Sequence, residues 1–185
     1  AEIVEFGGDF FRVKLLQKES NSNESARKVI LYCSILKREN FELVVQKATE
    51  VGVAEIVPLV RERTVKTVFK KERLIKIIKE AAEQSGRGVL PILTEPMDFN
   101  QNVKHAGQNE RNFLFNLSGE KFVISDIANL KQKTIGIFIG PEGGWGDFEM
   151  DLVRQREFKV VSLGKLTLRA ETAAIVVSYL ACQNL

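Results

Sequence analysis

The sequence "TIGIFIGPEGGWGDFEM" (residues 134–150) combines a strand, a loop and a helix. Its first part is an almost continuous apolar run of strand length, which is typical of a strand covered on both faces of a parallel sheet. A glycine-proline pair then ends the strand, and a short helix is expected from about Asp147. The loop between them contains Gly140, Gly143 and Gly144. Because glycine has no side chain, such a loop lets a ligand approach the backbone closely.

Further strands and helices alternate along the chain in the same way. Apolar runs predict strands over residues 29–36, 55–60, 112–117, 134–140 and 158–164. Apolar residues at helical spacing predict a helix from an N-cap at Asn40 to a stop at Gly52, a longer helix ended by Gly86, and a last helix from about Glu171. This order of elements indicates an α/β fold with a mostly parallel sheet.

The first residues have a different character. "AEIVEF", a Gly-Gly-Asp turn and "FFRVKLLQKE" predict a β-hairpin within residues 1–20. A lone hairpin is marginal in water, so we expect its partner strands in a preceding portion of the protein. Residues 21–28 belong to a polar stretch rich in Ser and Asn, which predicts a linker. The main domain is therefore expected to span residues 29–185.

The composition narrows the class of protein. The 185 residues are 44% hydrophobic and 28% charged, without an apolar run near the roughly 20 residues of a membrane span. Cys33 and Cys182 lie in apolar sequence and are expected to be buried free thiols of a cytoplasmic protein. His105 is the single histidine, which argues against a zinc cluster or a histidine triad; no metal is expected. The net charge of +3 is compatible with a nucleic-acid partner without requiring one.

A second glycine-bearing loop, "SLGKLTLRAETA" (residues 162–173), follows another predicted strand. Both loops follow the carboxyl ends of parallel strands, where open α/β sheets bind ligands. The first loop lacks the Gly-Lys-Ser/Thr of a phosphate-binding loop, and neither loop has the G-x-G-x-x-G spacing of dinucleotide sites. Glu142 would also repel a pyrophosphate, so the ligand is not expected to be anionic there.

Taken together, "IGPEGGW" and "LGKLTLRAETAA" resemble the RsmE family of 16S ribosomal RNA uridine-N3 methyltransferases, members of the SPOUT superfamily. Residues 41–66 and 73–93 resemble segments of the same family in the same order. The sequence departs from the family at Trp145, Lys165 and Ala170, where Phe, Pro and Thr are usual. The resemblance implies a SPOUT-type parallel sheet with a deep C-terminal trefoil knot. It also implies that the hairpin is the remnant of a PUA-like β-barrel.

The resemblance further implies S-adenosyl-L-methionine as cofactor, bent in the knot and held largely by backbone groups. The residues implied in cofactor binding are Leu117, Gly140, Gly143, Gly144, Leu163, Gly164, Leu168 and Thr172. Arg169 and Glu171 are the implied catalytic residues: the arginine steadies RNA phosphate or a developing uracil anion, and Glu171 orients the site or acts as base. A plain ion pair that caps the last helix is the structural alternative for these two residues.

Contacts to RNA are expected from Arg61, Arg63, Lys66, Gln84 and Arg87, although each set could equally be a solvated polar face. Trp145 could stack on a base or plug the knot. His105 is expected to be an ordinary surface residue.

The resemblance implies a homodimer acting on 16S rRNA of the small ribosomal subunit. The last helix is apolar almost all round, which indicates cover on more than one side. Two other functions stay open: a SPOUT methyltransferase acting on another rRNA or tRNA position, and a catalytically idle RNA-binding module.

Overall fold

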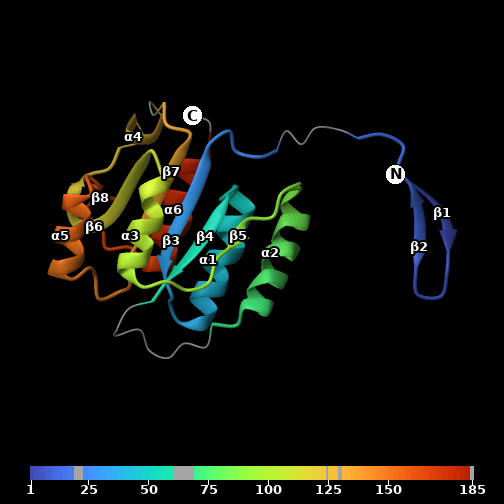
Figure 1. Cartoon of the computed structure of the whole chain (residues 1–185), viewed down its shortest axis with the longest axis horizontal. Helices are drawn as coiled ribbons and strands as arrows, with labels where there is room; N and C mark the ends of the chain where they lie inside the picture. Colours follow the sequence, from blue (N-terminus) through green and yellow to red (C-terminus); the bar gives the residue numbers. More distant parts are fainter. Residues whose placement is uncertain (19–22, 61–68, 124, 129–130, 184–185) are drawn as a thin grey trace.

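A computed structural model describes residues 1–18, 23–60, 69–123, 125–128 and 131–183. Its centre is a six-stranded sheet in the order β5-β4-β3-β7-β6-β8, and every strand pair in it is parallel (Figure 1). The strands are β3 (Lys28–Ser34), β4 (Glu55–Leu59), β5 (Ile92–Leu93), β6 (Arg111–Lys121), β7 (Thr134–Ile139) and β8 (Lys159–Ser162). The predicted parallel α/β fold is confirmed.

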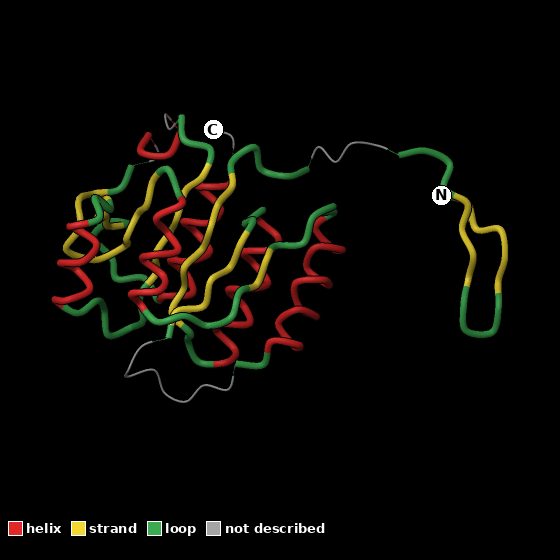
Figure 2. Tube along the Cα trace, in the orientation of Figure 1, coloured by secondary structure: helices red, strands yellow, loops and turns green. Residues whose placement is uncertain are grey.

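Helices cover both faces of this sheet, as the tube view shows (Figure 2). Those of one face are α1 (Arg38–Val51), α2 (Lys71–Ser85) and α6 (Ala170–Cys182), which pack on the odd-numbered positions of β3 from Val29 to Cys33. The other face carries α3 (Phe99–His105) and α5 (Asp147–Gln155), which pack on Ile30 and Tyr32. Successive side chains of a strand point to opposite faces, so a continuous apolar run serves both cores. The short helices η1 (Ala106–Gln108) and α4 (Ser125–Ala128) complete the described elements.

Local chemistry sets most of the helix ends. Gly52 and Gly86 adopt left-handed backbone at the carboxyl ends of α1 and α2, where glycine carries no steric penalty. The start of α1 differs from the prediction, because Lys37 rather than Asn40 is the N-cap and its side chain makes no capping bond. The helix α3 was not predicted. It begins at a capping box in which Asp98 accepts from the backbone N–H of Gln101 and the Gln101 side chain accepts in return.

The helix α6 departs from the expectation of burial all round. Val177 is fully buried within the chain itself, as are Ala174 and Ala181. Val176 and Tyr179 face solvent, with exposed fractions of 38% and 51%. The helix therefore has one face in the core and an apolar face that this chain leaves uncovered.

The N-terminal residues form the predicted antiparallel hairpin of β1 (Glu2–Phe6) and β2 (Phe11–Lys14). It is drawn apart from the six-stranded sheet in Figure 1. No helix in the described ranges is long and apolar enough to cross a bilayer.

Candidate cofactor site

A pocket of about 290 Å³ opens at the carboxyl edge of β6, β7 and β8. Its size is near the lower end of the roughly 300–1,000 Å³ of small-molecule sites. Three segments form its walls: residues 115–117, residues 139–145 and residues 162–170, with Ala173 of α6 behind them. This is the edge at which open α/β sheets hold ligands. The two glycine-bearing loops therefore meet in one site, as the sequence predicted.

The first loop is a tight turn. The backbone N–H of Gly144 donates to the carbonyl of Pro141 over 2.9 Å, and Gly144 has a φ of +70°. An L side chain rarely adopts this conformation, whereas glycine adopts it freely. No atom lies within 4 Å of the place where a Cβ of Gly144 would stand, so the backbone faces open space. Beyond the turn, Glu149 accepts from the N–H of Gly146 over 2.7 Å and fixes the start of α5.

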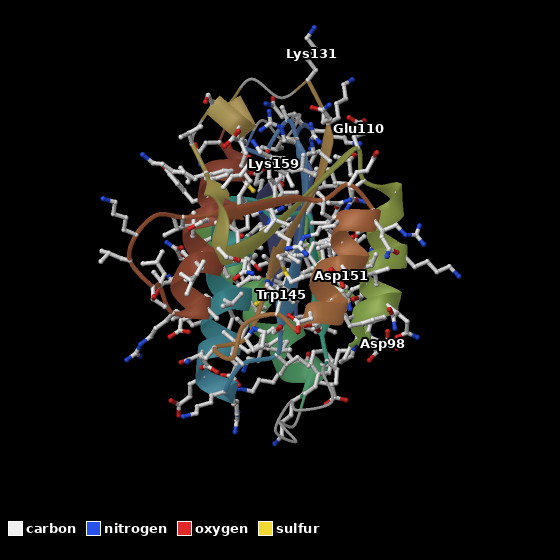
Figure 3. All side chains as sticks on the ribbon, turned by 90° about the vertical axis from the view of Figure 1, so that its left-hand side faces the viewer. Asp98, Glu110, Lys131, Trp145, Asp151 and Lys159 are labelled. Carbon is white, nitrogen blue, oxygen red and sulfur yellow. The ribbon has the colours of Figure 1, made fainter. Side chains whose placement is uncertain are left out.

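Gly140 has a different reason to be glycine. A Cβ there would stand 2.9 Å from Cε2 of Trp145. The indole N–H donates to the carbonyl of Phe115 over 2.9 Å, and the ring packs at 5.4 Å from that of Phe99. Figure 3 labels Trp145 on the side of the molecule that carries α5 and β8. Of the two roles considered for Trp145, this packing favours the structural one.

An irregularity in β6 supplies the second wall. Phe115 pairs with Val161 of β8, but the next paired residue is Glu120, so residues 116–119 leave the ladder. Asn116 and Leu117 then face the pocket. The strand returns at Gly119, where a Cβ would stand 2.5 Å from the backbone carbon of Val161. Only glycine permits this approach.

The second loop begins at Ser162, whose hydroxyl lies 3.2 Å from the carbonyl and 3.3 Å from the N–H of Gly164. Gly164 has a φ of +129°, again with no atom within 4 Å of a Cβ position. Beyond it, Leu166 and Leu168 line the pocket with exposed fractions of 80% and 38%.

Arg169 and Glu171 occupy different surroundings. The Arg169 side chain is 83% exposed and belongs to the pocket rim. Glu171 is buried and is not among the described residues that line the pocket. The two groups are 4.0 Å apart, and the other carboxylate oxygen of Glu171 finds no hydrogen-bond partner within the described ranges. Arg169 is therefore accessible at the pocket rim, whereas Glu171 is enclosed in the core beside it.

Most residues implied in cofactor binding lie on the pocket wall. They are Leu117, Gly140, Gly144, Leu163, Gly164 and Leu168. Gly143 and Thr172 are absent from the described lining. The lining also contains Asn116, Pro141, Trp145, Ser162 and Thr167, which were not predicted as cofactor contacts. Adjacency to a predicted residue was the available sequence signal for them.

The residues expected to bind RNA divide into two groups. Arg61, Arg63 and Lys66 lie outside the described residues. Gln84 and Arg87 lie at the carboxyl end of α2, and Arg87 bonds to the carbonyl of Val53, just before β4 begins. That is the amino edge of the sheet, so these two residues lie away from the pocket.

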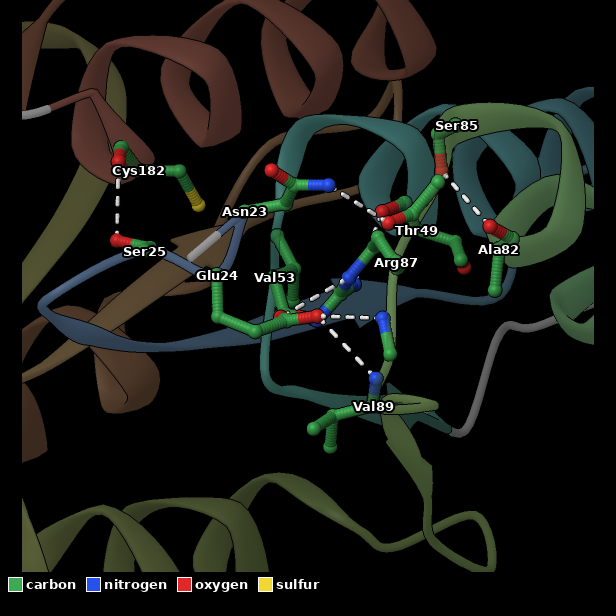
Figure 4. Close-up of polar contacts among 12 residues, drawn as sticks. Asn23, Glu24, Ser25, Thr49, Val53, Ala82, Ser85, Arg87, Val89 and Cys182 are labelled. Atoms are coloured by element: carbon green, nitrogen blue, oxygen red, sulfur yellow. Dashed lines mark hydrogen bonds and ion pairs between the residues drawn. The ribbon is translucent and has the colours of Figure 1, made fainter. Parts of the chain in front are cut away.

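Arg87 is moreover a buried structural residue, with 4% of its side chain exposed. Its guanidinium donates to the carbonyls of Thr49 and Val53, each over 2.9 Å, and to the carboxylate of Glu24 over 2.7 Å (Figure 4). Glu24 also accepts from the N–H groups of Gly88 and Val89. The predicted RNA contact of Arg87 is therefore wrong.

His105 is likewise more than a surface residue. Its Nδ1 lies 2.9 Å from the hydroxyl of buried Tyr32, and its Nε2 lies 3.3 Å from the carboxylate of Glu55. The amide of Asn109 donates to the same tyrosine hydroxyl over 3.1 Å. This network lies at the amino edge of the sheet, away from the pocket.

The pocket suits a cofactor that is bound by main-chain groups of the protein. The open Cβ positions of Gly144 and Gly164 leave main-chain groups of both loops accessible, and leucine side chains supply apolar walls. Among the described residues, no group of three or more His, Cys, Asp or Glu side chains could hold a metal ion.

Comparison with known sequences gives a consistent picture. The family described as RNA methyltransferase domain matches residues 23–181. The ribosomal RNA small subunit methyltransferase E of Mesomycoplasma hyopneumoniae is 34% identical over 172 residues, which are 89% of this chain and 73% of the relative. The protein of the same name from Synechocystis is 37% identical over 169 residues, which are 88% of this chain and 55% of the relative. The chain thus spans between about half and three quarters of these relatives.

Solved structures agree with the sequences. A Legionella pneumophila methyltransferase in complex with S-adenosylmethionine is similar with a TM-score of 0.74 and 33% identity, over 85% of this chain and 66% of that one. The ribosomal RNA small subunit methyltransferase E of Neisseria gonorrhoeae, bound to S-adenosylmethionine, has a TM-score of 0.74 and 27% identity, over 86% and 67% of the two chains. The fold, the pocket and these likenesses place the chain in the RNA methyltransferase domain family, among relatives named ribosomal RNA small subunit methyltransferase E.

Proposed function

We propose that this protein transfers a methyl group from S-adenosyl-L-methionine to N3 of a uridine in 16S rRNA of the small ribosomal subunit. The observation that carries the proposal is the pocket at the carboxyl edge of β6, β7 and β8, where both glycine loops expose their backbone. Relatives named for this class of substrate cover most of the chain, and similar structures contain the cofactor. A ribosomal substrate also implies a cytoplasmic enzyme.

Different walls of the pocket would supply the polar and the apolar contacts to the cofactor. Main-chain groups around Gly144 and Gly164 would bind the polar edge of the adenine, while Leu117, Leu163 and Leu168 would enclose its apolar faces. Glu142, which also lines the pocket, places a carboxylate where a cationic sulfonium is tolerated. When bound, the cofactor supplies an activated methyl group on that sulfonium.

The chain must also bind and orient the uracil. Its N3 would lose a proton to solvent water before it attacks, and the resulting charge would spread onto the flanking oxygens. The N3–methyl bond would form as the methyl–sulfur bond breaks, with the electron pair of that bond left on sulfur. Arg169 is a largely exposed cation on the pocket rim and would stabilise this charge as it develops. In-line positioning supplies much of the rate of such a transfer, so an orienting cation and a closed pocket are the main contributions required of the chain. Glu171 would act indirectly, by holding Arg169 and the start of α6.

The path of the chain after β8 supports the proposed trefoil knot. The strand β8 lies at one edge of the sheet, beside β6. The following helix α6 nevertheless packs against α1 and against β3 and β7 at the centre of the sheet. Residues 163–169 must therefore lead the chain from the edge strand β8 back to the centre of the sheet. A C-terminal knot requires a return of this kind.

The N-terminal hairpin supports a β-domain ahead of residues 21–28. Its cross-strand pairs Ile3–Val13 and Phe6–Phe11 form one apolar face, and Glu2–Lys14 and Glu5–Arg12 form a charged face. Phe6 is 79% exposed, and the other three apolar residues are also exposed. A hairpin of this pattern needs cover on its apolar face, which further strands of a PUA-like barrel would provide.

The exposed apolar face of α6 supports a homodimer. Val176 and Tyr179 stand uncovered on a helix that also forms the back of the pocket through Ala170 and Ala173. A second copy is the cover that we propose for this face. The proposed RNA contacts still include three cations that follow β4 directly in the chain, Arg61, Arg63 and Lys66. Gln84 also stays a proposed contact, and the bound RNA would then have to extend from the pocket to the amino edge of the sheet.

Methyl transfer to isolated small ribosomal subunits tests the proposal. After incubation with S-adenosylmethionine, nucleoside mass spectrometry of the 16S rRNA should show 3-methyluridine, and heat-denatured protein should give none. A methyl group on another nucleoside would identify a different target for the same enzyme. Binding of RNA without any cofactor-dependent product would favour the idle RNA-binding module.

A further inference from the structure

The β6–β7 ladder is extended by a side chain. Its last paired residues are Phe115 and Ile139, after which β7 turns into the first loop. The carbonyl of Phe115 then accepts from the indole N–H of Trp145 over 2.9 Å. An indole donor thus fastens the far end of the loop to β6 just where residues 116–119 leave the β6–β8 ladder.

The indole ring is held on further sides. Gly140 lies so close that a Cβ there would stand 2.9 Å from Cε2 and 3.2 Å from Nε1. The ring of Phe99, at the start of α3, lies 5.4 Å away with an interplanar angle of 54°. Phe99 in turn contacts Phe138 of β7, with ring centroids 6.5 Å apart. Trp145 is therefore located by β6, β7 and α3 together.

We propose that Trp145 is a positioning residue for the cofactor, which sets the separation of two pocket walls. It fixes residues 140–145 against Phe115, and the next two residues of β6, Asn116 and Leu117, form the opposing wall. The inference rests on the proposed function, because it assigns the separation to binding of S-adenosylmethionine. It gives Trp145 no contact with the uridine.

The same geometry argues against base stacking by Trp145. A stacking platform needs a free aromatic face and a mobile or exposed ring. Here the ring is partly buried against the core formed by Phe99 and Phe138. Its polar atom is directed to a protein carbonyl instead of to solvent.

Trp145→Phe removes the N–H donor and keeps an aromatic ring in the core. The loss of one hydrogen bond should raise the dissociation constant for S-adenosylmethionine about fivefold. The KM for the cofactor should rise by the same factor, whereas kcat and the KM for ribosomal subunits should change less than about twofold. This split distinguishes a positioned pocket from a general loss of structure.

Phe158→Leu is the matched control. Phe158 packs on Phe138 in the same core, with ring centroids 5.1 Å apart, and is not among the described lining of the pocket. The substitution should lower the free energy of unfolding while leaving the affinity for the cofactor unchanged. If this control weakens binding as much as Trp145→Phe does, core stability rather than the indole bond sets the affinity, and the inference fails.

Gly140→Ala provides an independent variant. Its methyl group would displace the indole, so affinity should fall at least as much as in Trp145→Phe. When Gly140→Ala is combined with Trp145→Phe, the nearest indole atoms, Cε2, Cζ2 and Nε1, are no longer there, and the added methyl group should cost much less affinity. Additive effects of the two substitutions would show that Gly140 acts without Trp145, and would overturn the coupling that we propose.

Calorimetric titration of the wild-type chain distinguishes failure of the proposed function from failure of the positioning role of Trp145. If wild-type protein fails to bind S-adenosylmethionine, the proposed function fails. If wild-type protein binds it and Trp145→Phe binds equally well, the proposed function stands and the positioning role is wrong. Trp145 is the single tryptophan, so its fluorescence should also change on titration of wild-type protein with cofactor.

Discussion

The guanidinium of Arg87 lies 2.7 Å from the carboxylate of Glu24 and fastens the polar stretch before β3 to the carboxyl end of α2. Asn23 adds a bond to the carbonyl of Gly86, and Ser25 adds one to the carbonyl of Cys182 at the end of α6. Residues 23–25 thus join two helices at the edge of the sheet that faces away from the pocket. These contacts are structural, and they distinguish Arg87 from a residue that binds RNA.

Arg87→Met should therefore destabilise the fold without weakening cofactor binding. Removing one partner of a buried ion pair leaves the other uncompensated, so we expect the free energy of unfolding in urea to fall by about 3 kcal/mol. Arg154→Met is the control, because Arg154 and Asp151 form an exposed pair with a contribution of about 0–1 kcal/mol. Equal stability losses, or a cofactor affinity that falls with Arg87→Met in folded protein, would contradict this assignment.

Gly144→Val should abolish binding of S-adenosylmethionine. The φ of +70° is strained for valine, and its branched side chain would enter the open space before the backbone. Gly143→Ala is the matched control, since no positive φ is found at Gly143 and an added Cβ would meet no atom within 4 Å. Calorimetry and far-ultraviolet dichroism should show both variants folded and only Gly143→Ala binding. Normal binding by Gly144→Val would exclude the first loop as a cofactor wall.

Arg169→Ala should retain cofactor binding and lose most methyl transfer. The side chain is 83% exposed at the rim of the pocket, where it can contact the uracil. It is not one of the residues that we propose to bind the cofactor. Loss of a preorganised cation of this kind reduces kcat by roughly 100- to 1,000-fold. Arg111→Ala, an exposed arginine at the amino edge of the sheet, should leave kcat unchanged. An Arg169→Ala enzyme with full activity would rule out the role.

The fold could be predicted to a large extent because its strands are continuous apolar runs. Residues 29–36 and 134–140 signal burial on both faces, and the parallel ladder follows from the helices between strands. The helix α3 escaped prediction because it has only seven residues and depends on tertiary packing of Phe99, although the capping box of Asp98 and Gln101 is a local signal of its start. The start of α1 was misplaced because Lys37 makes no side-chain cap that the sequence could reveal.

The site could be predicted where glycines mark it, and less well elsewhere. Gly144 and Gly164 need glycine for their backbone conformation, which a local pattern can reveal. Gly140 is glycine because of Trp145, and Gly119 because of the backbone of Val161, which are contacts of the folded chain. Arg87 shows the opposite difficulty. A charged residue beside a helix is normally predicted to be exposed. The burial of Arg87 depends on Glu24, which is 63 positions away in the sequence.

The proposed dimer can be tested on the exposed face of α6. Tyr179→Glu should shift the protein to a folded monomer in sedimentation experiments, because Tyr179 is 51% exposed within one chain. Val177→Glu, in contrast, should unfold the chain, since Val177 is fully buried and an unpaired charge there has no compensation. A wild-type protein that sediments as a folded monomer at micromolar concentration would contradict the proposal.

The two buried thiols should lower the free energy of unfolding at high pH. Burial raises the pKa of Cys33 to about 12, with Glu171 adding to the effect. Burial also raises the pKa of Cys182 to about 12, although Arg87 and Arg27 act in the opposite direction. Both pKa values exceed the usual 9.0, so the unfolded chain loses these protons first. The stabilising contribution is complete below pH 9 and should disappear as the pH rises toward 12.

Cys33→Ala/Cys182→Ala should accordingly show a weaker decrease of the free energy of unfolding between these pH values. At about pH 8 a thiol reagent should react slowly with native wild-type protein and rapidly after unfolding, because neither thiol is exposed. Rapid reaction of the native protein, or the same pH dependence in both proteins, would show that the thiols are not the buried groups seen in the structure.

The most direct measurement of the central claim is calorimetric titration of this chain with S-adenosylmethionine, beside the Gly144→Val and Gly143→Ala variants. We expect saturable binding at one site per chain for wild type and Gly143→Ala, and none for Gly144→Val. Absence of binding by the folded wild-type chain would contradict the account, as would saturable binding that Gly144→Val leaves unchanged.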